Sequence, residues 1–159
     1  MTTLVRRAAG VDHARVDAVI DDWWGGRPMR RMLPRLFFEH FSDTSSVVEE
    51  DGELVAFLIG FVSGAHPDEA YIHFVGVRPD RRRKSHARTL YERFFAIAGE
   101  RGCRSVGCIT APTNAGSIAF HRSMGFDVVP GDAIVKEIPI HTAYDGPGED
   151  RVVFHREQP

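Results

Sequence analysis

The 159-residue sequence has few cysteines, no long apolar run and no pattern of metal ligands. Its two cysteines, Cys103 and Cys108, have a spacing that points them to opposite faces of one strand, so we expect free thiols in a reducing compartment. No apolar run approaches the roughly 18 residues of a membrane-spanning helix, and the first segment, MTTLVRRAAG, lacks the apolar core of a signal peptide. The eight histidines do not show the spacing of metal ligands. These absences predict a cytoplasmic protein with no metal and no membrane contact.

An excess of positive charge is also missing, because the formal net charge is -2. The chain therefore lacks the overall basic field of a nucleic-acid-binding protein, and an anion site has to come from a local cluster such as residues 81–84. A nucleic-acid contact through that cluster is disfavoured, because interleaved aromatic residues are missing as well. The length and the content of 43% hydrophobic and 26% charged residues indicate one soluble domain spanning residues 1–159.

Hydrophobic periodicity predicts which segments form helices and strands. Residues 87–98 show the clearest helical repeat, with apolar side chains recurring every three or four positions. Asp51-Gly52 marks a two-residue hairpin turn, because both positions of such a turn need positive φ. Further helices are predicted over residues 11–24, 34–41 and 114–124. Strands are predicted over residues 3–8, 46–50, 53–63, 70–77, 105–110, 126–129, 133–140 and 151–155. This order predicts an α/β (α+β) fold, in which helices cover the faces of a mixed sheet.

The segment VRPDRRRKSHA, residues 77–87, joins a predicted strand to the clearest helix. It contains five basic residues and no glycine. The N-terminus of a helix has unpaired N–H groups and a partial positive charge, and Arg82, Arg83 and Lys84 add full charges beside it. A pyrophosphate fits such a site. A solvated basic face or a localisation signal would explain the same residues equally well.

A second motif, NAGSIAFHRSMGF at residues 114–126, favours the phosphate site. The two motifs together resemble those of the GCN5-related N-acetyltransferase (GNAT) superfamily. The loop is similar to V-x-P-x-x-[RQ]-x-x-G-x-[GA] through Val77, Pro79, Arg82 and Ala87. The second motif supplies an asparagine, a short helix and a closing Gly-Phe, and it matches at Asn114, Phe120, Gly125 and Phe126. Residues 144–151 are similar to a loop that precedes the last strand in many bacterial members.

The resemblance implies acetyl-CoA as cosubstrate and a GNAT-like, mostly antiparallel twisted sheet of about seven strands with about four helices. It also implies a homodimer as a family-level expectation. The strand before the basic loop would splay from its neighbour near residues 75–77, so that pantetheine pairs with the exposed backbone and the loop amides hold the pyrophosphate. The coenzyme-binding residues implied are Val75, Gly76, Val77, Arg82, Arg83, Lys84, Ser85, His86, Ala87, Arg88, Asn114, Ser117 and Phe120.

Two departures from the family pattern affect these expectations. Ser85 replaces the first loop glycine; a serine needs ordinary φ and adds bulk where the backbone should approach phosphate. Its hydroxyl would instead cap the helix or bind phosphate. His121 replaces the tyrosine that usually protonates the leaving thiolate, and a histidine can serve as that acid. The alternative for His121 is a helix-surface side chain with no role.

The acceptor amine must lose a proton before it attacks, so a base is needed. The resemblance places the usual base at Ile109, which cannot serve, whereas some members place a histidine where His73 lies. Alternation along the strand puts Tyr71, His73 and Val75 on one face, and the N–H near Val75 would stabilise the oxyanion. A hydrogen-bonded core histidine is the structural alternative for His73.

The acceptor is expected beside the first two helices and the late hairpin, with Trp23, Trp24, Tyr71 and Tyr144 as candidate contacts. The alternative for Trp23 is packing in the core. Cys108 suggests a thioester route, but no histidine–acid pair lies beside it in sequence, and family members transfer the acetyl group directly. The expected reaction is therefore acetyl transfer to an amine of a small molecule, peptide or protein. The alternative is an acyl-CoA-binding sensor with little catalytic activity.

Overall fold

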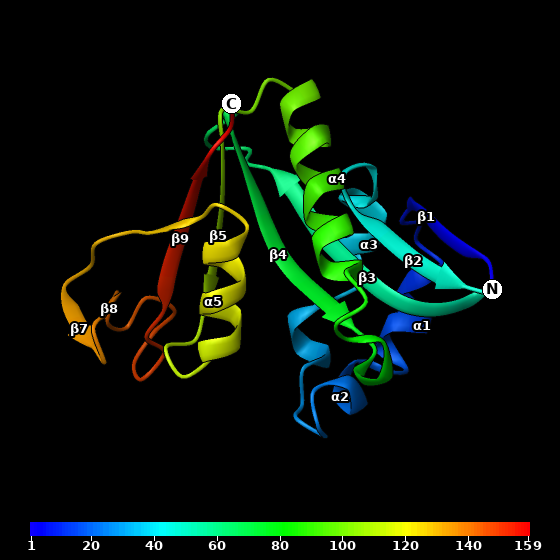
Figure 1. Ribbon diagram of the computed structural model, residues 1–159, viewed down its shortest axis with the longest axis horizontal. Coiled ribbons are helices and arrows are strands. Elements are labelled where there is room, and N and C mark those ends of the chain that lie inside the picture. The colour runs from blue at the N-terminus through cyan, green and yellow to red at the C-terminus, as the bar shows by residue number, and fades with distance from the viewer.

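The computed structural model describes residues 1–159 and contains one large sheet with helices on both faces (Figure 1). Seven strands lie in the order β1-β2-β3-β4-β5-β9-β6, and every neighbouring pair is antiparallel except β4 and β5. The predicted mixed, mostly antiparallel sheet is confirmed. The strands of this sheet are β1 (Thr3–Arg7), β2 (Ser46–Glu50), β3 (Glu53–Val62), β4 (Glu69–Val77), β5 (Ser105–Thr110), β6 (Asp127–Val128) and β9 (Val152–Glu157).

The helices divide between the two faces of the sheet and define two hydrophobic cores. The first core lies under α4 (His86–Glu100) and α5 (Ala115–Ser123), and Phe94 and Phe154 are among its fully buried side chains. The second core lies under α1 (Asp12–Asp17), α2 (Ile20–Trp23) and α3 (Leu36–His40), where Phe38 and Phe57 are fully buried. Short 3-10 turns η1 (Arg30–Met32), η2 (Ser42–Thr44) and η3 (Pro79–Arg81) connect these elements. None of the helices has the length and apolarity needed to cross a bilayer.

Most predicted elements are confirmed within one or two residues, and the turn at Asp51 and Gly52 has the expected positive φ values of 50 and 83°. Cys103 and Cys108 are free, as predicted, although both pack in the first core. The predicted helix over residues 11–24 is wrong in its middle, because Val19 leaves the helical conformation with a φ of -120°. Two short helices form in its place, so the fold has five α-helices rather than about four.

The predicted single strand over residues 133–140 is also wrong. The structure has a separate two-stranded hairpin of β7 (Ala133–Val135) and β8 (Ile138–Ile140). Lys136 and Glu137 form its turn with φ values of 47 and 68°. Neither residue type is common at positive φ, so the sequence contains no turn pattern at this point.

A β-bulge changes the expected faces of β4. Ile59 pairs with Phe74 and the next residue of β3 pairs with Ile72, so His73 is an extra residue without a partner. Ile72 therefore packs in the first core and Phe74 in the second. The prediction that Tyr71, His73 and Val75 share one face is wrong, because Val75 packs against the first core while His73 faces α3.

Candidate functional site

Strands β4 and β5 separate early, and this leaves one edge of β4 free. Their parallel pairing covers only Glu69 to Tyr71 on β4, so the splay opens several residues before the predicted position. Arg78 donates its N–H to Val55 on β3. Because bonded and non-bonded positions alternate along an antiparallel pair, the N–H groups of Val75 and Val77 point the other way, into the splay. The guanidinium of Arg82 reaches the Val77 carbonyl, which confirms that direction.

The loop between β4 and α4 presents a run of unpaired backbone donors. No N–H group from Arg82 to Arg88 donates a hydrogen bond within the chain. They surround a cavity of about 310 Å³ at the N-terminus of a 15-residue helix, where the helix dipole adds partial positive charge. The residues lining this cavity are Val77, Arg81, Arg82, Arg83, Ser85, His86, Ala87, Arg88 and Phe120. The arrangement has the donors and the charge that a pyrophosphate needs.

Ser85 takes the conformation of the glycine that it replaces. Its φ is 64° and its ψ is 13°, in the left-handed region, and its side chain makes no capping hydrogen bond. Arg83 also has a positive φ, of 70°. The expectation that Ser85 keeps ordinary φ is therefore wrong. The loop has the backbone path that turns amides toward an anion, and it holds that path despite the cost of a Cβ atom at this conformation.

Some basic side chains of the loop have partners within the chain and others do not. Arg81 forms an ion pair with Glu50 at 2.5 Å. Arg82 donates from Nη2 to the Trp23 carbonyl at 2.7 Å, which ties the loop to the end of α2. Arg83 and Lys84 are exposed and make no ion pair or side-chain hydrogen bond within the chain. Arg83 lines the cavity and is free for a ligand anion there, whereas Lys84 is also free but does not line the cavity.

Glu50 fastens the loop at two points. Its carboxylate is only 5% exposed and accepts from Arg81 in η3 and from His86, the first residue of α4, at 3.0 Å. The hydrogen bond from Arg81 is the largest cause that lowers the pKa of Glu50, so this carboxyl is ionised at neutral pH. The sequence patterns contained no indication of Glu50, because it acts through residues more than 30 positions away.

His73 lies at the bulge of β4, between a backbone carbonyl and an aromatic ring. Its Nε2 donates to the Met32 carbonyl at 2.6 Å, and its ring stacks on Phe37 at 4.2 Å. Burial lowers the pKa of His73 below its ordinary value, and the Met32 carbonyl only partly opposes this. Nδ1 makes no hydrogen bond within the chain and is not sealed from water. The imidazole is therefore neutral at pH 7 and has one free basic nitrogen.

His121 lies in the first core and is not on the helix surface. It is 6% exposed, stacks on Phe154 at 4.5 Å and accepts at Nε2 from the Tyr91 hydroxyl at 2.8 Å. Its Nδ1 donates to the Ser117 carbonyl at 2.7 Å, and burial lowers its pKa. With both nitrogens engaged, the imidazole has no proton directed at the splay. The geometry gives His121 a packing role and does not support the expected acid role.

The remaining coenzyme candidates are Asn114, Ser117, Phe120 and Gly76. Asn114 caps α5 by accepting from the Ser117 N–H at 3.1 Å, and Phe120 joins the loop residues at the cavity. A glycine is needed at position 76 for a different reason from the expected one. A Cβ atom there would lie 2.5 Å from the Phe57 ring and 2.9 Å from the Trp24 ring. Its missing side chain makes room for the second core, not for a close approach of pantetheine.

The four acceptor candidates lie in different environments. Trp23 is 6% exposed and stacks on Phe57, so it is a core residue, as its structural alternative proposed. Trp24 is half-buried and packs on Phe74 at 4.9 Å. Tyr71 is half-buried beside Gly107, at the point where β4 and β5 part. Burial raises the pKa of Tyr71, and Tyr144, which is 49% exposed in a nearby loop, adds to that shift.

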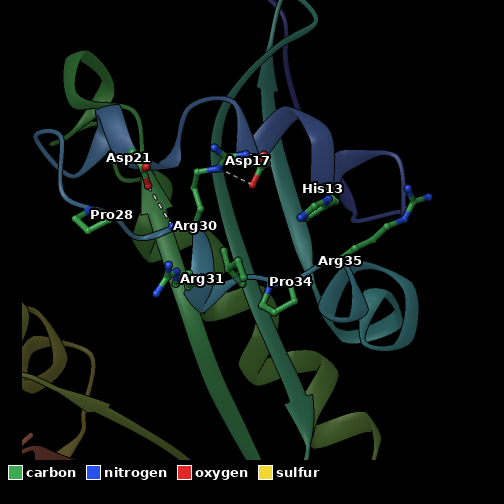
Figure 2. Close-up of a pocket in the computed structure, with 9 residues that line it drawn as sticks. His13, Asp17, Asp21, Pro28, Arg30, Arg31, Pro34 and Arg35 are labelled. Atoms are coloured by element: carbon green, nitrogen blue, oxygen red, sulfur yellow. Dashed lines mark hydrogen bonds and ion pairs between the residues drawn. The ribbon is translucent and has the colours of Figure 1, made fainter.

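A second cavity, of about 500 Å³, lies over α1 and the 28–35 segment (Figure 2). Its charges are largely paired within the chain. Arg30 forms a bidentate contact with Asp17, and Asp21 accepts the N–H groups of Met29 and Arg30. These contacts fix the segment that carries the Met32 carbonyl. The cavity is thus part of the frame that holds His73 in place.

The sequence profile of the acetyltransferase (GNAT) family matches residues 13–126, which is well over half of the chain. The chain belongs to the GNAT family. The match covers both α1 to α3 and the coenzyme-type loop, so the resemblance seen in the second half of the sequence extends to the first.

Named relatives and solved structures agree with this membership. The chain is 29% identical over 89 residues to an L-2,4-diaminobutyric acid acetyltransferase from Nocardia farcinica (strain IFM 10152), covering 56% of this chain and 46% of that protein. This chain therefore matches about half the length of that relative. The fold is shared with the diaminobutyrate acetyltransferase of Paenibacillus lautus in complex with its substrate and coenzyme A, at 21% identity, a TM-score of 0.73 and coverage of 99% and 95%. It is also shared with the ribosomal-protein-S18-alanine N-acetyltransferase of Escherichia coli, at 19% identity, a TM-score of 0.70 and coverage of 99% and 94%.

Proposed function

We propose that this chain is an N-acetyltransferase that uses acetyl-CoA as cosubstrate and a primary amine as acceptor. The observation that carries the proposal is the run of unpaired N–H groups from Arg82 to Arg88 at the N-terminus of α4, next to the free edge of β4. Family membership and the solved GNAT structures with acetyl-CoA or coenzyme A support the same cosubstrate.

Each part of the site has its own role in this reaction. The loop amides and the free cation Arg83 bind the pyrophosphate, and Lys84 adds positive charge from outside the cavity. The free edge of β4 binds pantetheine by strand-like pairing. The N–H of Val75 points into the splay and donates to the oxygen of the tetrahedral intermediate. His73, through Nδ1 or a water bound to it, accepts the proton of the attacking amine.

No dedicated acid is required for the leaving group. A thiol is a much stronger acid than an amine, since a cysteine thiol has a pKa of about 8.5, so the thiolate can leave unprotonated and then take a proton from water. Cys108 takes no part, because burial raises its pKa far above neutrality and keeps it protonated. The amine therefore attacks the thioester directly.

Thiol release from acetyl-CoA tests the proposal when it is followed over a panel of primary amines, amino acids, aminoglycosides and peptide N-termini. L-2,4-diaminobutyrate belongs in the panel because a relative is named for it. Amine-dependent thiol release, with N-acetyl product by mass spectrometry, is the expected result. Tight binding of acetyl-CoA without turnover on any amine would indicate a sensor, and the proposal would fall.

Replacing Glu50 is expected to loosen the phosphate-binding loop. The change Glu50→Ala frees Arg81 and His86, and we expect coenzyme A affinity to fall about tenfold, equal to about 1.4 kcal/mol of binding free energy. Glu50→Gln keeps acceptor and shape and should recover part of that loss. Calorimetric titration with coenzyme A measures both. Glu53→Ala, an exposed carboxylate on the same hairpin, is the control. Unchanged affinity in Glu50→Ala would show that the loop is rigid without it.

Replacing Ser85 with glycine is expected to relax the same loop. Glycine removes a left-handed strain of about 1 kcal/mol, so Ser85→Gly should unfold at higher urea than Ser85→Ala, which keeps the Cβ atom. Coenzyme A affinity should not fall, because the serine hydroxyl makes no hydrogen bond in the loop. Equal stability of the two variants would contradict the strain. A loss of affinity in both would show that the hydroxyl contacts phosphate.

A further inference from the structure

Five rings form a continuous surface on the α3 face of the sheet. His73 stacks on Phe37 at 4.2 Å, and Phe37 meets Phe41 at 5.7 Å. Phe41 meets Phe61 at 4.8 Å, and Phe61 meets Tyr71 at 5.6 Å. Tyr71 and His73 lie two residues apart on β4, so the row returns to the strand on which it began. We call these five residues the aromatic surface.

The aromatic surface lies outside both cores. All five side chains are half-buried, and none belongs to the buried set of either core. Phe41, Phe61 and Tyr71 do not pack against either core, while Phe37 borders the second. Leaving an aromatic side chain exposed to water costs free energy, so such rings are usually covered by packing. Each ring keeps part of its surface open to water, so together the five offer an apolar face on which a ligand can stack.

The aromatic surface also lies where chemistry is expected. Tyr71 is the last residue of β4 that pairs with β5, so one end of the row borders the opening of the splay. The other end is His73, the base of the proposed function, whose Nδ1 is free. A flat molecule stacked on Phe61 and Phe41 can therefore extend a side group between Tyr71 and His73, beside the point where β4 parts from β5.

Polar groups at the rim favour a positively charged ligand. The Tyr71 hydroxyl makes no hydrogen bond within the chain, and burial raises its pKa, so it stays a neutral group that can both donate and accept. Asp145 lies close enough to contribute to that shift. Its loop also carries Glu149 and Asp150 against a single cation, Arg151. An ammonium is attracted both by this acidic loop and by the faces of the rings.

We propose that the aromatic surface binds the body of the acceptor, and that the acceptor is a primary amine carried on an aromatic ring by a short linker. This inference rests on the proposed function and names its substrate class. The ring of the acceptor stacks on Phe41 and Phe61, and its amine reaches His73. A strongly hydrophilic acceptor such as diaminobutyrate leaves the rings exposed and gains nothing from them.

Matched ligands test the class directly. Phenylethylamine, its saturated counterpart cyclohexylethylamine, butylamine and L-2,4-diaminobutyrate are compared in kcat/KM for thiol release and in saturation-transfer NMR with coenzyme A present. Phenylethylamine should give the highest kcat/KM and the strongest transfer to its ring protons. The changes Phe41→Leu and Phe61→Leu remove a ring but keep apolar bulk. Each should raise the KM for phenylethylamine about threefold to tenfold. Butylamine has no ring to stack, so its KM should change by a smaller factor in both variants. Leu36→Ala replaces an exposed apolar residue on α3 and should change the KM for neither phenylethylamine nor butylamine.

The outcomes separate the two claims. Rapid acetylation of diaminobutyrate with no binding of phenylethylamine would overturn the aromatic acceptor and leave the N-acetyltransferase in place. Binding of phenylethylamine that the two leucine variants weaken, without turnover on any amine, would support the aromatic surface and contradict the proposed function. Equal KM values for phenylethylamine in the parent chain and both leucine variants would overturn the inference even if the amine is acetylated.

Discussion

Replacing His73 with glutamine is expected to lower kcat/KM about 100-fold, the low end of the range for losing a general base. Glutamine can keep the hydrogen bond to the Met32 carbonyl and pack on Phe37, but it has no basic nitrogen. The loss should therefore appear in kcat, with coenzyme A affinity unchanged. Steady-state kinetics and calorimetry on the same variant measure the two quantities. Equal losses of affinity and turnover would instead indicate a structural role for His73.

The pH profile gives a second readout of the same residue. Only neutral His73 can accept a proton, so the rate rises with pH as the imidazole loses its proton. Burial lowers the pKa of His73, which places this inflection below the ordinary value of about 6.5. The inflection should be present in the parent chain and missing in His73→Gln. An inflection that survives the substitution would assign the base elsewhere.

The second large effect is expected at Asp12, where removal of the carboxylate should cost about 3–5 kcal/mol of unfolding free energy. Its side chain is fully buried and accepts from Arg6 at 2.8 and 2.9 Å and from the Ala9 N–H at 2.9 Å. Arg6 and Arg15 also contact Glu49, so the network joins β1, α1 and β2. Urea unfolding of Asp12→Ala measures the loss. Asp17→Ala breaks only a more exposed pair with Arg30 and should cost about 1 kcal/mol or less.

The same network gives stability a definite dependence on pH. Burial alone would raise the pKa of Asp12, but hydrogen bonds from Arg6 and the Ala9 N–H outweigh it and lower the pKa. The pKa of Glu49 is lowered by Arg6 and Arg15. A carboxyl with a lowered folded pKa stabilises the fold above its unfolded value and loses that contribution as pH falls through the folded value. The parent chain should lose stability in acid more steeply than Asp12→Ala, and parallel curves would contradict this account.

The sequence predicted the parts of this protein that depend on local pattern. The hairpin at Asp51 and Gly52, the long helix α4 and the strand before the basic loop all follow from periodicity or turn chemistry. The motif at residues 77–87 marked the loop that precedes α4, and the motif at residues 114–126 marked α5. These features need only a few neighbouring residues to be specified, so one sequence was sufficient.

Features that depend on distant contacts escaped prediction. The bulge at His73 arises from the pairing of β3 with β4, and no residue of β4 marks it. His121 is buried because Tyr91, 30 residues earlier, offers its hydroxyl to the imidazole. Ser85 takes a left-handed conformation because both ends of its loop are fastened, at Arg81 and His86, by Glu50. In each case tertiary structure overrides the local preference of the residue.

The central claim is that the loop between β4 and α4 receives the pyrophosphate of the coenzyme beside the free edge of β4. Backbone-amide NMR shifts on titration with coenzyme A test it most directly. The account predicts the largest changes at the unpaired amides of residues 82–88, followed by those of Val75 and Val77. Changes centred instead on the cavity lined by His13, Asp17 and Arg30, or no changes at all, would contradict it.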